Sequence, residues 1–147
     1  MFKHILVPTD GSLLSQETVA RAASFARDAG ARVTLFYARP EPSAAYEGLG
    51  AISSSHLTPE IHARLDEAAQ EILEDAEKTM REAGVACQRL VLVGHKAAQL
   101  IIQAAESNEC DLIFMASHGR RGVSALLLGS ETQKVLTHSK IPVLVYR

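Results

Sequence analysis

Strand-like and helix-like patterns alternate along this chain from one end to the other. The strand-like segments are short and apolar, and they lie at 4–7, 32–38, 86–93, 111–116 and 142–146. Segments with apolar residues every three or four positions separate them, so the order of elements is βαβ, a loop, then αβαβαβ. Such alternation is typical of a parallel sheet with helices on both faces. We therefore predict an α/β fold, a doubly wound five-stranded parallel sheet with strand order 3-2-1-4-5.

The helical segments differ in how clearly they begin and end. We expect helices over 15–29 and 96–107, two short helices over 123–128 and 130–138, and a long helix over 58–83. The long helix has a strong start signal, because a capping hydroxyl is followed by a proline and then by an acidic residue. Its charged residues are expected to form a solvated face.

Residues 39–57 are rich in Pro, Gly, Ser and Ala and show no periodicity, which predicts a long loop. A loop of this length is either a lid over a site or a solvated excursion, and the sequence favours neither. With 147 residues in total, the whole chain, 1–147, suits one domain.

Composition excludes several classes of function. A formal net charge of −2 gives no general attraction to nucleic acid or to anionic lipid. No segment approaches the ~20 apolar residues of a membrane span, and the N-terminal apolar patch is too short for a signal peptide. Cys87 and Cys110 form no CxxC pair and lie beside apolar strands, so we expect buried free thiols. These observations predict a soluble cytoplasmic protein.

The segment 115–133 is the most unusual part of the sequence. It places three glycines around two adjacent arginines, directly after a strand that reads as buried on both faces. Glycine lets peptide N–H groups approach a phosphate, and a helix that opens at Ser130 would add its own N–H groups. Arg120 and Arg121 would add charge-assisted contacts.

A second strand exit carries Asp10. In open α/β sheets, ligands bind beyond the carboxyl ends of the strands, where the strand order reverses. If the strands before Asp10 and Gly119 are neighbours, both residues face one crevice, and Asp10 can accept hydrogen bonds from a ribose. The combination suits a nucleotide. Ordinary turn chemistry is the alternative, with Asp10 as a helix cap, Gly119 as a turn residue, and Ser130 with Gln133 as a capping box.

Three segments carry a family resemblance over the whole chain. They are HILVPTDGS near the start, Val93-Gly94 in the middle, and DLIFMASHGRRGVSALLLGSETQKVL followed by IPVLV at the end. Together they resemble a single-domain universal stress protein. ATP-binding members of that family carry Gly, two residues, Gly, nine residues, then Gly with Ser or Thr. Gly119 and Gly129-Ser130 match this motif, whereas Ala116 stands at the first glycine. A methyl group there is tolerated if the backbone is extended, which the preceding apolar run favours.

This resemblance implies an adenine nucleotide alpha hydrolase-like fold and an ATP site, with or without Mg²⁺. The matching positions are Pro8, Thr9 and Asp10 for adenine and ribose, Ala38 beside the adenine, Met115, Ala116, His118 and Gly119 along the middle, and Gly129, Ser130, Glu131 and Thr132 at the phosphates.

The histidines have mostly structural interpretations. His118 either donates a hydrogen bond to a phosphate or holds its own turn together, and the second is favoured. We expect His56 and His62 to be exposed, because their spacing across a proline gives poor metal geometry. We assign no chemistry to the isolated histidines His4, His95 and His138.

These features predict a nucleotide-binding regulatory protein of the stress response. P-loop, GxSxG and paired metal-binding carboxylate patterns are absent from the sequence, so we expect at most slow ATP hydrolysis. The alternative is a dimeric interaction module that binds no nucleotide. We also expect a homodimer through the final strand, 142–146, which the predicted order leaves at a sheet edge. Alternatively, the loop at 39–57 covers this edge of the sheet. The sequence names no protein partner.

Overall fold

The computed structural model describes residues 1–42, 54–120 and 127–147. Its five strands are β1 (His4–Pro8), β2 (Arg32–Pro40), β3 (Cys87–Gly94), β4 (Leu112–Ala116) and β5 (Val143–Tyr146). All neighbouring strands pair in parallel, and the order across the sheet is β3-β2-β1-β4-β5. The predicted topology is therefore confirmed. The strand order reverses between β1 and β4, and this is where a doubly wound sheet opens a crevice.

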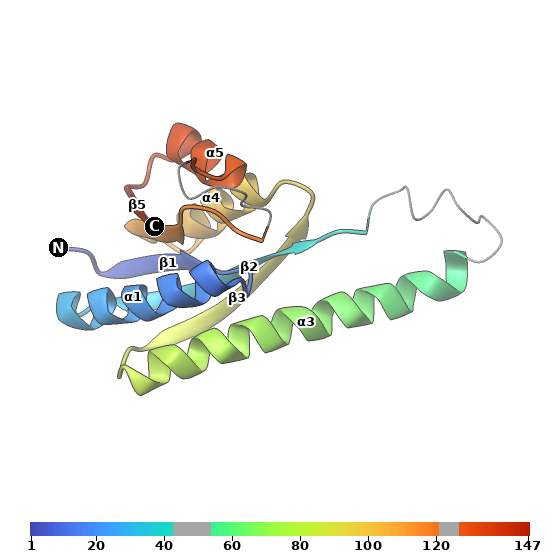
Figure 1. Ribbon diagram of the computed structural model, residues 1–147, viewed down its shortest axis with the longest axis horizontal. Helices are drawn as coiled ribbons and strands as arrows, with labels where there is room; N and C mark the ends of the chain where they lie inside the picture. The colour runs from blue at the N-terminus through green and yellow to red at the C-terminus, as the bar shows by residue number, and fades with distance from the viewer. Residues whose placement is uncertain (43–53, 121–126) are drawn as a thin grey trace.

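Four helices cover the sheet in the described part of the chain. They are α1 (Leu13–Ala29), α3 (Ser54–Glu82), α4 (Ala97–Ser107) and α5 (Ser130–His138). Figure 1 shows α1 and α3 on one face of the sheet and α4 and α5 on the other. None of these helices combines the length and the apolarity that a membrane-spanning segment requires.

Each face of the sheet has its own hydrophobic core. Successive side chains of a strand point to opposite faces. In β1, Ile5 and Val7 join the core under α1 and α3, whereas Leu6 joins the core under α4 and α5. All three are fully buried. This burial on both faces explains why β1 and β4 appear in the sequence as continuous apolar runs.

The long helix begins earlier than the sequence predicted. α3 starts at Ser54 rather than at 58, and Pro59 lies inside it. A proline within a helix removes one N–H and crowds the preceding turn. Pro59 falls in the second turn of a helix of 29 residues, so only one backbone hydrogen bond, near the N-terminal end of the helix, is lost. The predicted start signal was wrong because it treated the proline as a boundary.

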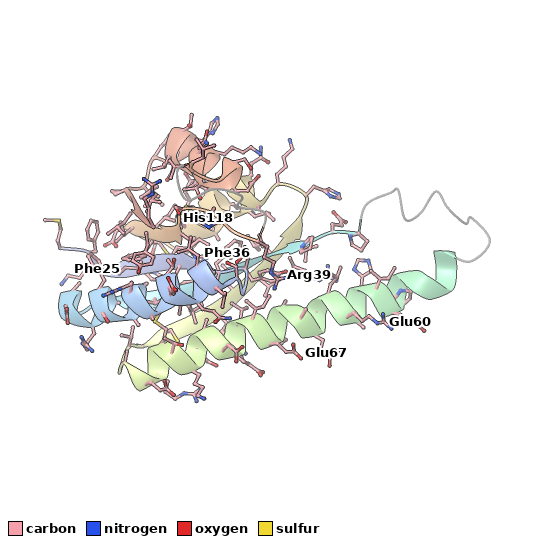
Figure 2. All side chains as sticks on the ribbon, in the orientation of Figure 1. Phe25, Phe36, Arg39, Glu60, Glu67 and His118 are labelled. Atoms are coloured by element: carbon pink, nitrogen blue, oxygen red, sulfur yellow. The ribbon has the colours of Figure 1, made fainter. Side chains whose placement is uncertain are left out.

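A buried arginine joins α3 to β2. Arg39 is 3% exposed, and its Nε lies 2.8 Å from Oδ1 of Asp66. Its Nη2 donates to Nδ1 of His62 at 2.9 Å and to the His62 carbonyl at 3.0 Å. His62 is therefore half-buried, and the expectation that it is exposed was wrong. Figure 2 shows Glu60 and Glu67 pointing away from the sheet, as expected for the solvated side of this helix.

Two predicted segments fall on residues that the structure does not describe. Residues 43–53 lie outside the described residues, so the choice between a lid and a solvated loop is not tested. The flanks of this segment were misplaced, because β2 continues to Pro40. Residues 123–126 of the predicted helix over 123–128 are also outside the described residues, and Leu127 and Leu128 are not helical.

Candidate functional site

A cavity of about 430 Å³ opens at the carboxyl ends of β1, β2 and β4, beyond the point where the strand order reverses. All the predicted site residues except Arg121, which lies outside the described residues, line this one cavity. They are Pro8, Thr9, Asp10, Ala38, Met115, Ala116, His118, Gly119, Arg120, Gly129, Ser130, Glu131 and Thr132. Figure 2 labels two residues of its wall, Phe36 from β2 and His118 from the loop after β4. The geometric part of the prediction, one crevice shared by Asp10 and Gly119, thus agrees with the structure.

The sequence missed six lining residues: Ser15, Phe36, Tyr37, His95, Ala97 and Ile101. His95 had a usable signal, because it directly follows Gly94 at a strand exit, as Asp10 does after β1. Its Nε2 lies 3.2 Å from Oε2 of Glu41, which joins the exits of β3 and β2. Phe36 and Ile101 had no separate signal, since a buried apolar residue reads the same whether it packs against protein or lines a pocket.

The loop after β1 is fixed by a chain of hydrogen bonds. Thr9 donates its N–H to the Phe36 carbonyl at 2.8 Å, and its hydroxyl lies 2.6 Å from that of Ser15. Asp10 donates its N–H to the same Ser15 hydroxyl at 3.1 Å. Ser12, not Asp10, is the N-cap of α1, since its hydroxyl accepts from the Ser15 N–H. The alternative of Asp10 as the helix cap was therefore wrong.

The Asp10 carboxylate ties two loops together. Its Oδ1 accepts from the Ser12 N–H at 3.0 Å, and its Oδ2 accepts from the Arg120 N–H at 3.0 Å. Gly119 packs so closely on this carboxylate that a Cβ at 119 would overlap Oδ2. Gly119 therefore permits a close approach between two parts of the protein beside the cavity.

The Arg120 side chain lies over the start of α1. Its Nη2 is 3.1 Å from where a Cβ on Gly11 would stand. Arg120 also lines a second cavity of about 260 Å³, whose walls come mainly from α1 and α3. Arg121, the other predicted phosphate contact, lies outside the described residues.

β2 runs past the end of β1 along the wall of the cavity. Their register ends with Pro8 opposite Phe36, and the hydrogen bond from the Thr9 N–H to the Phe36 carbonyl is the last backbone bond between them in the described residues. Backbone polar groups of a strand alternate between its two neighbours, and those of Val33 bond towards β3. The backbone groups of Ala38, two residues after Phe36, point to the same side of β2 as those of Phe36, towards β1. Because β1 has ended there, no described strand lies opposite the Ala38 N–H and C=O. They therefore present one donor and one acceptor to the cavity.

Gly129 serves the protein's own packing. Its N–H donates to the Ser117 carbonyl at 2.7 Å. A Cβ at 129 would stand 3.1 Å from the His118 Cα and 3.2 Å from the Ser117 oxygen. Its φ of −60° is open to any residue, so this crowding is the reason for a glycine. This N–H is thus already bonded within the protein, and the place of Gly129 beside a phosphate stays a prediction.

The first turn of α5 faces the cavity. Gly129 is the N-cap, so Ser130 is the first helical residue, and the predicted capping box was wrong. Gln133 donates its side-chain amide to the Leu128 carbonyl instead. The N–H groups of Ser130, Glu131 and Thr132 have no intrahelical acceptor, because they precede the first bonded turn. All three residues line the cavity, so the helix end offers an anion three donors.

Ala116 has the extended backbone that the sequence argument favoured. It is the last residue of β4, and in the described residues the only non-glycine with positive φ is Glu109. Its carbonyl accepts from the buried Thr132 hydroxyl at 2.9 Å, which joins β4 to α5. His118 makes a local contact, with Nδ1 3.2 Å from the Ser117 hydroxyl, as its structural interpretation predicts.

Glu131 directs its carboxylate to the neighbouring helix. Oε2 accepts from the Ala98 N–H at 2.8 Å, and Oε1 accepts from Lys134 Nζ at 2.9 Å. Burial by itself raises the pKa of this carboxyl, but the bonds from Lys134 and Ala98 outweigh burial, and the pKa is lowered. Glu131 is therefore a charged cap for α4.

Comparison with known proteins agrees with this architecture. The model of the Universal stress protein family matches residues 1–147. Universal stress protein MJ0531 of Methanocaldococcus jannaschii is 34% identical over 147 residues, which are 100% of this chain and 83% of MJ0531. The solved structure of MJ0577 from the same organism superimposes with a TM-score of 0.81 at 28% identity, covering 99% of this chain and 95% of that chain.

A universal stress protein solved in complex with cAMP superimposes with a TM-score of 0.72 at 22% identity, covering 99% of this chain and 97% of that one. The fold that this chain shares with its structural neighbours is the adenine nucleotide alpha hydrolase-like fold. Because the family model matches every residue from 1 to 147, this chain belongs to the universal stress protein family.

Proposed function

We propose that this protein binds an adenine nucleotide, in the first instance ATP, and acts as a regulatory module of the stress response. The observation that carries the proposal is the free backbone edge of Ala38 in the wall of the cavity. Adenine offers a ring nitrogen that accepts and an amino group that donates, side by side. Guanine offers the reverse at the same edge, so a fixed N–H and C=O pair discriminates against it.

The rest of the cavity suits the rest of the nucleotide. Pro8, Ile101 and Met115 supply apolar walls for a flat base. The α5 N-terminus supplies N–H groups and the positive end of a helix dipole for phosphate. The family relative in complex with cAMP, which shares the fold, supports a ligand of this class. We expect a dissociation constant on the order of micromolar or weaker.

The residues that line the cavity do not fit a dedicated Mg²⁺ site. Among the described residues, the carboxylates that line it are those of Asp10 and Glu131, and all four of their oxygens already accept hydrogen bonds. In the described part of the chain, no group of three His, Cys, Asp or Glu could hold a metal ion. Binding is therefore proposed without a protein-held metal.

The same two carboxylates argue for binding rather than catalysis. A general base needs a lone pair directed at the proton that it takes. Asp10 and Glu131 hold structural hydrogen bonds at each carboxylate oxygen, from backbone N–H groups and from Lys134, and His118 contacts the Ser117 hydroxyl. We therefore propose a binding module.

Calorimetry with ATP and GTP tests the proposal on the wild type and two variants. Ala38→Pro removes the N–H that faces the cavity, and Pro40 in the same strand, on the same side, shows that proline is accommodated there. Ala38→Val is the matched control, because it changes the side chain and keeps the N–H. We expect Ala38→Pro to weaken the binding of ATP by about threefold to tenfold. The ratio of GTP to ATP dissociation constants should also become smaller.

No heat and no thermal stabilisation by ATP at about millimolar concentration, where even a weak site is filled, would refute nucleotide binding and leave the dimeric interaction module. Equal ATP affinity in Ala38→Pro and Ala38→Val would show that the base is read elsewhere.

We also propose that two copies of the chain pair through β5. This strand lies at one edge of the sheet, and its four residues are only half-buried within a single chain. A short apolar edge strand invites pairing, and a copy related by a two-fold axis would close the edge symmetrically.

A further inference from the structure

Two helix N-termini border the cavity, and one of them already holds an anion. Ala97 of α4 and Ser130 of α5 both line the cavity wall, and Figure 1 shows the two helices side by side. Lys96, the N-cap of α4, makes no side-chain cap bond. The carboxylate of Glu131 supplies this cap from α5, through the Ala98 N–H. The positive end of α4 is thus satisfied from within the protein, whereas that of α5 remains open.

Glu131 consequently places a fixed negative charge at the turn where a phosphate would bind. Its backbone N–H is one of the three open donors, while its side chain is held beside them on the α4 side. Lys134 compensates part of this charge. The Lys134 side chain is 58% exposed, so solvent weakens the compensation.

We infer that Glu131 is a specificity-determining residue, which reduces the gain in affinity from each phosphate added to the bound nucleotide. The inference rests on the proposed function and deepens it. One phosphate can occupy the α5 N-terminus. Further phosphates meet the Glu131 carboxylate at the N-terminus of α4. Without that carboxylate, the free N–H groups of α4 would be a second set of donors for phosphate. Repulsion grows with ligand charge, so it acts more on ATP than on AMP and not on adenosine.

Two variants change the charge in opposite directions. Glu131→Gln removes the negative charge and keeps an oxygen that accepts from the Ala98 N–H. Lys134→Met removes the compensating charge and keeps Glu131 in place. Lys140→Met is the matched control, because it removes one exposed positive charge beyond the other end of α5. Circular dichroism and thermal melting establish that each variant is folded.

Dissociation constants for adenosine, AMP, ADP and ATP are measured by calorimetry at low and high salt. We expect the ratio of AMP to ATP dissociation constants to rise about twofold to tenfold in Glu131→Gln and to fall in Lys134→Met. Both changes should shrink at high salt. Adenosine binding and the Lys140→Met ratio should stay at wild-type values.

Equal shifts for all four ligands in both variants would overturn the inference, because a purely structural cap does not sense ligand charge. So would an unchanged ratio in Glu131→Gln. Absence of binding by any of the four ligands to the wild type is a different result, and it would refute the proposed function itself.

Discussion

Arg120 donates its backbone N–H to Oδ2 of Asp10 at 3.0 Å, across 110 positions of sequence. This bond joins the loop after β4 to the loop after β1, on the two sides of the point where the strand order reverses. Gly119 precedes Arg120 and leaves no room for a Cβ beside the same carboxylate. The glycine therefore allows two loops of the protein to meet, and their meeting shapes the cavity.

Gly119→Ala tests this relationship. We expect the methyl group to displace the Asp10 carboxylate, to cost about 1–3 kcal/mol of the free energy of unfolding, and to weaken nucleotide binding. Urea unfolding and calorimetry measure the two effects. The double variant with Asp10→Ala is the control, because the overlapping group is gone. In that background Gly119→Ala should cost much less, and strictly additive losses would show that the methyl group clashes elsewhere.

Gly129→Ala is expected to destabilise the fold. The added Cβ would meet the backbone of Ser117 and His118, which cannot move aside as a flexible side chain does. We expect a loss of about 1–3 kcal/mol in the free energy of unfolding. Ser130→Ala, one residue on and in the same cavity wall, is the control and should be nearly neutral. A Gly129→Ala protein as stable as the wild type would contradict this interpretation.

The sheet could be predicted from sequence because its signals are local. Strands such as Leu112–Ala116 are continuous apolar runs between turn residues, and parallel connections leave few orders of strands to choose from. The cavity followed from the same logic, since Asp10 and Gly119 each stand just after a strand. Helix α3 shows the limit, because its local start signal at residues 58–60 was overridden inside a longer helix.

The roles within the site were harder to predict than its location. The sequence shows that position 129 needs a glycine, but not whether a ligand or the protein occupies the space beside it. Glu131 in a first helical turn suggests an interaction with its own helix, whereas its partner Ala98 belongs to another helix. Such contacts depend on how helices pack, and a pattern along one chain does not contain that information.

His4 should make stability depend on pH below neutrality. Its Nε2 lies 2.7 Å from the Thr34 hydroxyl, and Arg32 approaches Nδ1 at 3.2 Å. Burial lowers the pKa of His4 below 6.5, and the charge of Arg32 lowers it further, while Asp111 partly opposes both. Between the lowered pKa and 6.5 the unfolded chain binds the proton and the folded chain does not. Stability is therefore lost as pH falls through this window.

His4→Gln should flatten this dependence. Free energies of unfolding, measured between about pH 5 and pH 8, a range that brackets an ordinary histidine pKa, are compared for wild type and variant. His138→Gln replaces a histidine that the structure places on the exposed side of α5, and it should keep the wild-type slope. A slope in His4→Gln equal to that of the wild type would assign the pH dependence to other groups.

The two free cysteines should differ in reactivity. Cys110 is buried, and burial, with a smaller effect of Asp111, raises its thiol pKa to about 11. Cys87 is half-buried, and burial raises its pKa as well. Since the thiolate is the reactive form, we expect iodoacetamide at about pH 8, below the ordinary thiol pKa, to label Cys87 before Cys110. Mass spectrometry of the native protein measures both, and faster labelling of Cys110 would contradict its burial.

A proline in β5 should separate dimerisation from folding. The Ile113 N–H donates to the Pro142 carbonyl, and the Ser117 N–H donates to the Tyr146 carbonyl. By alternation, the backbone groups of Val143 and Val145 face away from β4. Val145→Pro therefore removes an outward N–H and leaves the β4–β5 pairing intact, as proline at an edge strand allows. A charge at Leu144 would be a poorer test, because Leu144 packs against the core under α1 and α3.

Sedimentation of wild type, Val145→Pro and Val145→Thr gives the answer. Threonine keeps both the N–H and the β-branched shape, so Val145→Thr should remain a dimer, whereas Val145→Pro should be a folded monomer. The wild type should be dimeric at about 10–50 μM, a concentration well above the dissociation constant of a stable dimer. A monomeric wild type at that concentration would show that β5 is not an interface. A folded, dimeric Val145→Pro would place the interface on another surface, because antiparallel pairing of β5 needs the N–H that this variant lacks.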